Sequence, residues 1–331
     1  CLRAMGHKDD MDSTDSTALS LKHISSLIFV ISAQYPLISY VAYNRNDMEK
    51  VTACLSVVFT NMLTVIKIST FLANRKDFWE MIHRFRKMHE QSASHIPRYR
   101  EGLDYVAEAN KLASFLGRAY CVSCGLTGLY FMLGPIVKIG VCRWHGTTCD
   151  VTVVVVAYAS AVDGLFISFA INLRAHFQTL QRQIENWEFP SSEPDTQIRL
   201  KSIVEYHVLL LSLSRKLRSI YTPTVMGQFV ITSLQVGVII YQLVTNMDSV
   251  MDLLLYASFF GSIMLQLFIY CYGGEIDTAV RLYNWHLASP KTRTSLSLII
   301  PQSQKEVLIR AGFFVASLAN FVGICRTALS L

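Results

Sequence analysis

The sequence predicts an all-α integral membrane protein with seven transmembrane helices, a cytoplasmic N-terminus and helices that extend into a packed cytoplasmic region. Three observations lead to this fold class. Hydrophobic residues make up 52% of the chain and charged residues only 16%, against about 25% charged residues in a soluble domain. Seven apolar runs are each long enough to cross a bilayer, which takes about 20 residues. Lysine and arginine gather in alternate segments between these runs, as they do in membrane proteins of fixed orientation.

The seven runs contain few charges. The first is uncharged, and we expect it to be retained because it is longer than the apolar part of a cleaved signal peptide and follows four aspartates. The second contains Lys67, the third Arg118 and the fourth Asp163. The fifth is uncharged, the sixth has only Asp252 at its edge, and the seventh contains Arg326. In order, the runs are residues 24–43, 51–73, 113–137, 151–173, 220–244, 251–271 and 311–331.

The distribution of positive charge predicts the orientation. The N-terminal segment and the three long connections carry 22 lysines and arginines, whereas the three short connections carry 3. The long connections are therefore expected in the cytoplasm, with the N-terminus inside and the C-terminus outside. This orientation is opposite to that of G-protein-coupled receptors. Their Asp-Arg-Tyr and Asn-Pro-x-x-Tyr motifs are also absent from this sequence.

The long connections have helical patterns. Between residues 77 and 90, apolar residues recur every three or four positions, and residues 205–220 repeat the pattern. Such spacing is typical of amphipathic helices. We expect the membrane helices to continue into the cytoplasm and pack there; helices that lie on the lipid surface are the alternative.

No catalytic motif is present in the sequence. It has no Gly-x-x-x-x-Gly-Lys phosphate loop, no Gly-x-Ser-x-Gly turn and no His-Glu-x-x-His metal motif, so we expect no enzymatic activity, cofactor or metal. Cys121 and Cys124 have metal-site spacing, but they lie in an apolar run without a second pair, which favours helix packing. The basic residues follow membrane topology and form no nucleic-acid-binding patch. Cys142 and Cys149 flank an outer loop, where a disulfide is a candidate.

Charged residues inside the runs are candidates for function. A carboxylate in mid-membrane is costly and normally faces protein or water, so Asp163 is either a functional group or a neutral side chain hydrogen-bonded to a neighbouring helix. Lys67 and Arg118 lie near the inner ends of their runs, from which we expect them to extend to the interface.

Aromatic residues crowd the outer halves of several runs. Aromatic-lined cavities suit small apolar ligands, with hydroxyl groups adding direction; helix packing and an interfacial aromatic belt are the alternative. The seventh run mixes Ser317, Asn320, Gly323, Thr327 and Ser330 with apolar residues. This mixture suits helix contacts or a water-lined path.

The C-terminal third resembles the insect odorant receptors. The resemblance rests on Leu-Gln-Leu-Phe-Ile-Tyr-Cys-Tyr-Gly-Gly-Glu at 265–275, Tyr-Asn-Trp at 283–285, Ser-Gln-Lys at 303–305 and Ala-Gly-Phe-Phe at 311–314. The related insect gustatory receptors usually have Thr-Tyr followed by Gln-Phe in the seventh span, which this sequence lacks.

The resemblance implies the subunit of a ligand-gated, nonselective cation channel in the plasma membrane. Four similar subunits would surround one pore, with an odorant co-receptor subunit, a small volatile ligand and membrane lipid as partners. The odorant pocket is expected among spans two to six, in their outer halves. By position, the candidate ligand-binding residues are Phe59, Tyr130, Phe131, Tyr158, Tyr256 and Phe260. The candidate pore-lining residues are Phe321, Ile324 and Ala328.

The resemblance also suggests three parts. They are a cytoplasmic N-terminal segment (1–23), a region with six helices, the pocket and the cytoplasmic extensions (24–310), and a pore-lining helix (311–331). The chain begins with Cys1, has a second outer loop of about ten residues and stops at Leu331. Compared with the family, these features suggest an incomplete sequence with a truncated seventh helix.

A seven-helix transporter that uses Asp163 as a proton or ion site is the alternative function. Transporters often contain half-helices broken by glycine or proline near the membrane centre. Gly134-Pro135 is the only such pair in a run, and it lies at the outer end.

Overall fold

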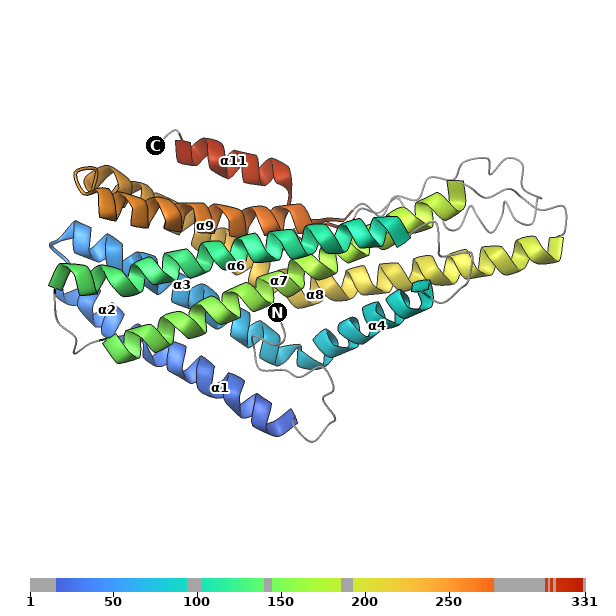
Figure 1. Ribbon diagram of the computed structural model, residues 1–331, viewed down its shortest axis with the longest axis horizontal. Helices are drawn as coiled ribbons and strands as arrows, with labels where there is room; N and C mark the ends of the chain where they lie inside the picture. The colour runs from blue at the N-terminus through green and yellow to red at the C-terminus, as the bar shows by residue number, and fades with distance from the viewer. Residues whose placement is uncertain are drawn as a thin grey trace.

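The computed structural model describes residues 16–93, 103–139, 145–185, 193–276, 307–308, 310–311 and 314–329. Long helices run side by side along the longest axis of the molecule (Figure 1). They are α1 (Ser16–Ser32), α2 (Gln34–Tyr43), α3 (Met48–Ala73), α4 (Arg75–Ala93), α6 (Leu103–Ile139), α7 (His145–Glu185), α8 (Glu193–Thr245), α9 (Val250–Gly274) and α11 (Leu318–Leu329).

Short turns join the helices at the predicted outer end, on the left of Figure 1. Asp47 caps α3, where its carboxylate accepts a hydrogen bond from the backbone N–H of Lys50 at 3.2 Å. At the other end of α3, the Asn74 side-chain amide donates to the Thr70 carbonyl at 3.0 Å. The chain then bends and continues at once as α4. Asn74 therefore separates the second membrane span from its inner extension.

Among the described residues, five helical segments are long and apolar enough to cross a membrane: Leu21–Tyr43, Met48–Ala73, Val154–Glu185, Gln197–Thr245 and Val250–Gly274. They overlap the first, second, fourth, fifth and sixth predicted spans. The backbone of α6 covers the predicted third span.

The seventh helix begins later than the sequence indicated. We expected a span from Ala311, but α11 begins at Leu318. The reason is local pairing, because β3 (Arg310–Ala311) pairs antiparallel with β4 (Phe314–Val315). A second strand pair, β1 (Glu275–Ile276) with β2 (Val307–Leu308), joins the end of α9 to the segment before α11.

The halves of the helices far from the short turns pack together, and they extend the bundle beyond the length that a bilayer needs. The 53 residues of α8 rise about 80 Å at 1.5 Å per residue, whereas the hydrocarbon core is about 30 Å thick. Phe78 and Met81 of α4 are buried in the same core as Phe177 of α7 and Leu213 of α8. The apolar face of α4 therefore packs on protein, which favours helical extensions over helices lying on lipid.

Candidate functional site

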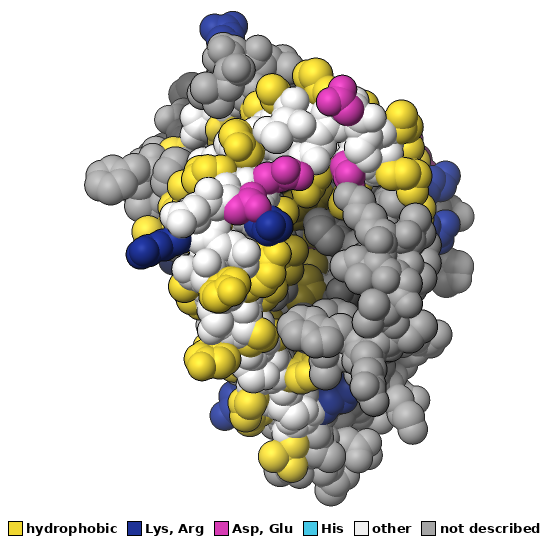
Figure 2. All heavy atoms as spheres, turned by 90° about the vertical axis from the view of Figure 1, so that its left-hand side faces the viewer, with side chains coloured by type: hydrophobic (Ala, Val, Ile, Leu, Met, Phe, Trp, Pro, Cys, Tyr) yellow, Lys and Arg dark blue, Asp and Glu magenta, His cyan; other side chains and the backbone are white. Residues whose placement is uncertain are grey.

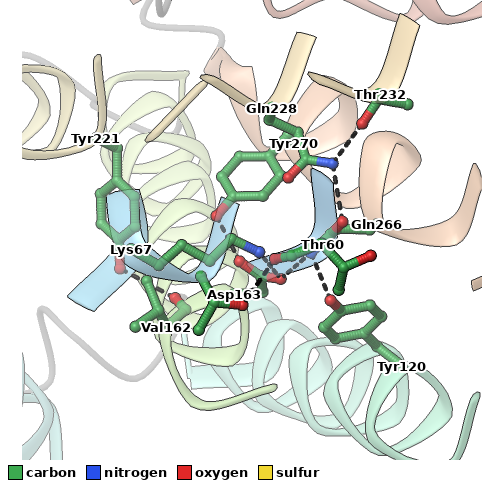
Figure 3. Close-up of polar contacts among 11 residues, drawn as sticks. Thr60, Lys67, Tyr120, Val162, Asp163, Tyr221, Gln228, Thr232, Gln266 and Tyr270 are labelled. Carbon is green, nitrogen blue, oxygen red and sulfur yellow. Dashed lines mark hydrogen bonds and ion pairs between the residues drawn. The ribbon is translucent and has the colours of Figure 1, made fainter. Parts of the chain in front are cut away.

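A network of buried polar side chains occupies the centre of the bundle (Figure 3). Lys67 of α3 donates from Nζ to Oδ2 of Asp163 on α7 at 2.7 Å. Gln266 of α9 donates from Nε2 to the same carboxylate oxygen at 2.7 Å. The hydroxyl of Tyr270, one turn further along α9, donates to Oδ1. We call Lys67, Tyr120, Asp163, Gln228, Gln266 and Tyr270 the central polar network.

Gln266 is the branching point of this network. Its Nε2 also donates to the hydroxyl of Tyr120 on α6, and its Oε1 accepts a hydrogen bond from Nε2 of Gln228 on α8 at 2.8 Å. A primary amide has two N–H donors and one carbonyl acceptor. Each of these groups has a partner on another helix, so one side chain links α9 to α6, α7 and α8 (Figure 3).

Lys67 and Asp163 are both 0% exposed. The prediction that Lys67 extends to the membrane interface is wrong, because its ammonium group turns inward to the carboxylate. Three donors converge on Asp163, and an ionised carboxylate is an acceptor only. The contacts therefore fit an ionised Asp163 with a lysine counter-ion better than the neutral aspartic acid that the sequence left open.

Polar side chains also join α3 and α8 in rungs. Gln242 donates to the hydroxyl of Thr52, Gln235 to that of Thr60 at 2.9 Å, and Thr224 to that of Thr70 at 3.2 Å. Our sequence reasoning missed this ladder and the network residues of α8 and α9. The spacing of seven residues in Gln228, Gln235 and Gln242, and of four in Gln266 and Tyr270, was the available signal, because such residues share one helix face.

Aromatic and aliphatic side chains gather in the outer part of α8 and α9. Ile239, Tyr256, Phe259 and Ile263 form a buried cluster, and half-buried Leu243 and Phe260 pack against it. We call these six residues the outer aromatic cluster. Two of them, Tyr256 and Phe260, are predicted ligand-binding residues.

Three hydroxyl groups lie between α6 and the same part of α9. The Ser262 hydroxyl is 2.6 Å from that of Ser123 and 2.9 Å from that of Thr127. Ser262 precedes Ile263 of the outer aromatic cluster, so the hydroxyl cluster and the aromatic cluster lie side by side along α9. This combination of apolar surface and a few converging hydroxyls suits small ligands.

Among the other predicted ligand-binding residues whose side chains the structure describes, Tyr158 and Phe59 lie outside the outer aromatic cluster. Tyr158 is buried in the larger core, where its hydroxyl is hydrogen-bonded to Nδ1 of His23 on α1. Phe59 is half-buried on α3. The backbone of Tyr130 and Phe131 belongs to α6, but their side chains lie outside the described residues. The structure thus joins Tyr256 to Phe260 and separates both from Tyr158.

The predicted pore helix packs on α9. The ring of Phe321 meets that of Phe268 edge to face, with centroids 5.7 Å apart. Ile324 also packs against the main core, whereas Asn320 and Val322 are exposed. Ala328 lies in the last turn of α11, and its side chain is outside the described residues.

The remaining candidates concern cysteine and metal chemistry. Cys142 lies outside the described residues, so its disulfide with Cys149 stays a prediction. Cys121 and Cys124 are free thiols on α6. Within the described parts of the chain, no three histidine, cysteine or acidic residues could hold a metal ion.

An ion pair links the inner extensions of α4 and α8. Lys216 of α8 donates to Asp77 at 2.9 Å and also to Glu80. The hydrogen bond from Lys216 holds the pKa of the Glu80 carboxyl below its usual value. Elsewhere on α8, burial lowers the pKa of His207, whose Nε2 has no hydrogen-bond partner among the residues that the structure describes.

These features define a helical membrane protein that crosses the bilayer several times and has a buried polar network at the centre of its bundle. The chain matches the family model for the 7tm Odorant receptor over residues 47–329 and belongs to the odorant receptor family. It is 90% identical to Odorant receptor 82a of Drosophila melanogaster, over 100% of this chain and 95% of that protein. Odorant receptor 45a of the same species is 26% identical, over 94% of this chain and 90% of that protein.

The fold is also found in solved structures. The insect olfactory receptor OR5 from Machilis hrabei in complex with eugenol has a TM-score of 0.82 at 14% identity, covering 99% of this chain and 93% of that chain. A second structure of OR5 gives 0.79 at 13% identity, with the same coverage. The predicted family and the seven-helix membrane fold are therefore confirmed. The members of this family are receptors, and the chain is an odorant receptor.

Proposed function

We propose that this chain is the odorant-binding subunit of a ligand-gated, nonselective cation channel that opens together with a co-receptor subunit. The observation that supports this function best is the outer aromatic cluster beside the Ser123, Thr127 and Ser262 hydroxyls. Both groups lie within one chain, which supports a ligand site inside a single subunit.

The chemistry of this site suits volatile ligands. Burying about 200 Å² of apolar odorant surface contributes about 5 kcal/mol at about 25 cal/mol per Å². Hydroxyl groups in the same place accept or donate hydrogen bonds and so distinguish ligands of similar size. Tyr256 supplies a ring and a hydroxyl, and Phe260 supplies shape. We keep Phe59, Tyr130, Phe131 and Tyr158 as candidates by position.

We place the pore at α11 in a tetramer of this chain and the co-receptor. Phe321 and Ile324 pack on their own subunit, so the side of α11 available to a pore or a neighbouring subunit includes Asn320 and Val322. Phe321, Ile324 and Ala328 are kept as pore candidates by their position in the seventh span alone.

The proposed location is the plasma membrane, with the N-terminus and the packed extensions in the cytoplasm. Charge supports this orientation, because the long connections carry 22 lysines and arginines. Acidic side chains gather at the opposite end of the bundle (Figure 2), where Asp47, Glu49, Asp248 and Asp252 belong to the short outer turns or the helix turns beside them.

The transporter alternative has little support from the contacts of Asp163. A proton or ion site needs a carboxylate that can release its partner. Lys67, Gln266 and Tyr270 already donate to both oxygens of Asp163.

The test is electrical recording from cells without native odorant receptors, with this chain, a co-receptor subunit or both. We expect a cation current that needs both subunits and a volatile ligand. Silence to a broad panel of volatiles, with both subunits at the cell surface, would refute the function.

A pair of tyrosine variants tests the site itself. Tyr256→Phe removes a hydroxyl from the outer aromatic cluster, whereas Tyr241→Phe removes one from a side chain of α8 that is 41% exposed. We expect Tyr256→Phe to change the rank order of odorants and Tyr241→Phe to leave it unchanged. An unchanged order in both variants would remove Tyr256 from the ligand site.

A further inference from the structure

We propose that Gln266 is a positioning residue for channel gating, and that it couples the odorant site to α11 through the central polar network without contacting the odorant. This inference rests on the function proposed above. It follows from the contacts of three parts of α9: the ligand-site residues, the network residues and the residues that meet α11.

The network residues of α9 lie between the outer aromatic cluster and the end of the helix, in the same half as Phe268. Gln266 and Tyr270 are four residues apart, so they share one face, and both donate to Asp163. Phe166 stacks on the Tyr270 ring with centroids 4.7 Å apart. The Nζ of Lys67 lies 5.8 Å from the centre of the same ring. Polar and aromatic contacts therefore hold this part of α9 against α7.

The inner part of α9 contacts the pore helix and the segment before it. Phe268 meets Phe321 of α11. A Cβ atom added to Gly274 would lie 2.6 Å from the backbone oxygen of Ala316, two residues before α11. Only a residue without a side chain fits this approach of the two backbones, so a shift of α9 at Gly274 would press on the segment that leads into α11.

The outer part of α9 carries Tyr256, Phe259 and Ile263 of the outer aromatic cluster. From Tyr256 to Gly274 the helix rises about 27 Å at 1.5 Å per residue. One rigid helix thus reaches from the ligand site to the start of α11, and Gln266 lies between the two.

Hydrogen bonds make Gln266 suited to this role. Apolar packing between helices tolerates small sliding movements, whereas an amide with three partners on three helices has one orientation in which all are satisfied. A movement of α9 must break or exchange these bonds. The network therefore contributes to the free-energy difference between the closed and open channel.

A residue that acts on this difference has a recognisable effect on odorant responses. A change in the closed–open equilibrium alters the apparent affinity of every odorant by a common factor. A change in a ligand contact alters the affinity of some odorants more than others. The two effects separate a coupling residue from a pocket residue.

The experiment compares Gln266→Leu with the matched variant Gln235→Leu. Both remove a buried, hydrogen-bonded amide, but among the described residues the side chain of Gln235 bonds to α3 alone. Each is expressed with the co-receptor, and dose–response curves are recorded for several odorants of different chemistry. For Gln266→Leu we expect the half-maximal concentration to shift at least fivefold by the same factor for all odorants. A fivefold shift corresponds to about 1 kcal/mol. For Gln235→Leu we expect less than a twofold change.

Tyr270→Phe is the second variant, because it removes the hydroxyl that donates to Asp163 and keeps the ring. We expect the half-maximal concentration to shift by a smaller factor that is again the same for all odorants. Shifts that differ between odorants would overturn the proposal and place Gln266 in the ligand site. Unchanged dose–response curves for Gln266→Leu at normal surface levels would show that Gln266 has only a structural role. The loss of both Gln266→Leu and Tyr270→Phe from the cell surface would show the same. The wild-type response separates these results from a failure of the proposed function, since a silent wild type refutes the receptor channel itself.

Discussion

Replacing Lys67 by methionine tests whether the buried ion pair stabilises the bundle. Lys67 and Asp163 are fully buried, and the ammonium group is the only cation that donates to Asp163 among the described contacts. Removing one member of a buried ion pair leaves an uncompensated charge, which costs about 3–5 kcal/mol. Methionine keeps most of the side-chain volume. The loss therefore measures charge pairing and not a cavity.

The assay is the thermal midpoint of the detergent-solubilised receptor complex, read together with the surface level in cells. We expect Lys67→Met to lower both strongly. The double variant Lys67→Met with Asp163→Asn restores part of the loss, because asparagine carries no charge and its carbonyl oxygen accepts one of the remaining hydrogen bonds. A double variant as unstable as Lys67→Met, or a single variant as stable as the wild type, would refute the reasoning.

Two further predictions concern the inner end of the molecule. A methyl group at Gly274 would lie 2.4 Å from the Cβ of Ala316, so Gly274→Ala is expected to displace the start of α11 and reduce the odorant-evoked current at normal surface levels. Gly261→Ala is the control, since a Cβ there meets nothing within 4 Å; equal currents in the two variants would contradict this contact. His207 has a pKa below its ordinary value of 6.5 because it is buried, so the folded receptor favours the neutral ring. Its stability should fall as the pH drops below about 6.5, and His207→Leu should weaken this dependence in thermal melts; the same dependence in both proteins would show that other groups cause it.

The sequence was enough for the fold class, because membrane spans follow from local composition. An uncharged run of 20 residues has few structural options in a bilayer. The predicted start of the seventh helix was wrong. The pairing of Arg310–Ala311 with Phe314–Val315 is a contact that apolar composition does not reveal. When only hydropathy is considered, the partly apolar residues 310–317 are assigned to the neighbouring membrane span.

The site was predicted in part, for a related reason. The sequence identified Asp163 as a costly charge and the outer aromatic residues as a group. It could not pair Asp163 with Lys67, which is 96 residues away in the chain. It also could not separate Tyr158 from Tyr256, since both lie in outer halves of spans. Tertiary packing decides which face of a helix meets which neighbouring helix. The residues within one helix do not reveal that choice.

The position of the central polar network explains why a membrane protein keeps an expensive ion pair. Lipid tails are as apolar as leucine, so apolar packing alone gives helices in a membrane little preference for one rotation or register. Asp163 accepts from Gln266 and Tyr270 only when that face of α9 is turned toward α7. Asp163, with Lys67 as its counter-ion, therefore favours this rotation of α9. Because Tyr256 and Phe268 are on the same helix, this rotation also decides which side chains face the ligand site and which face α11.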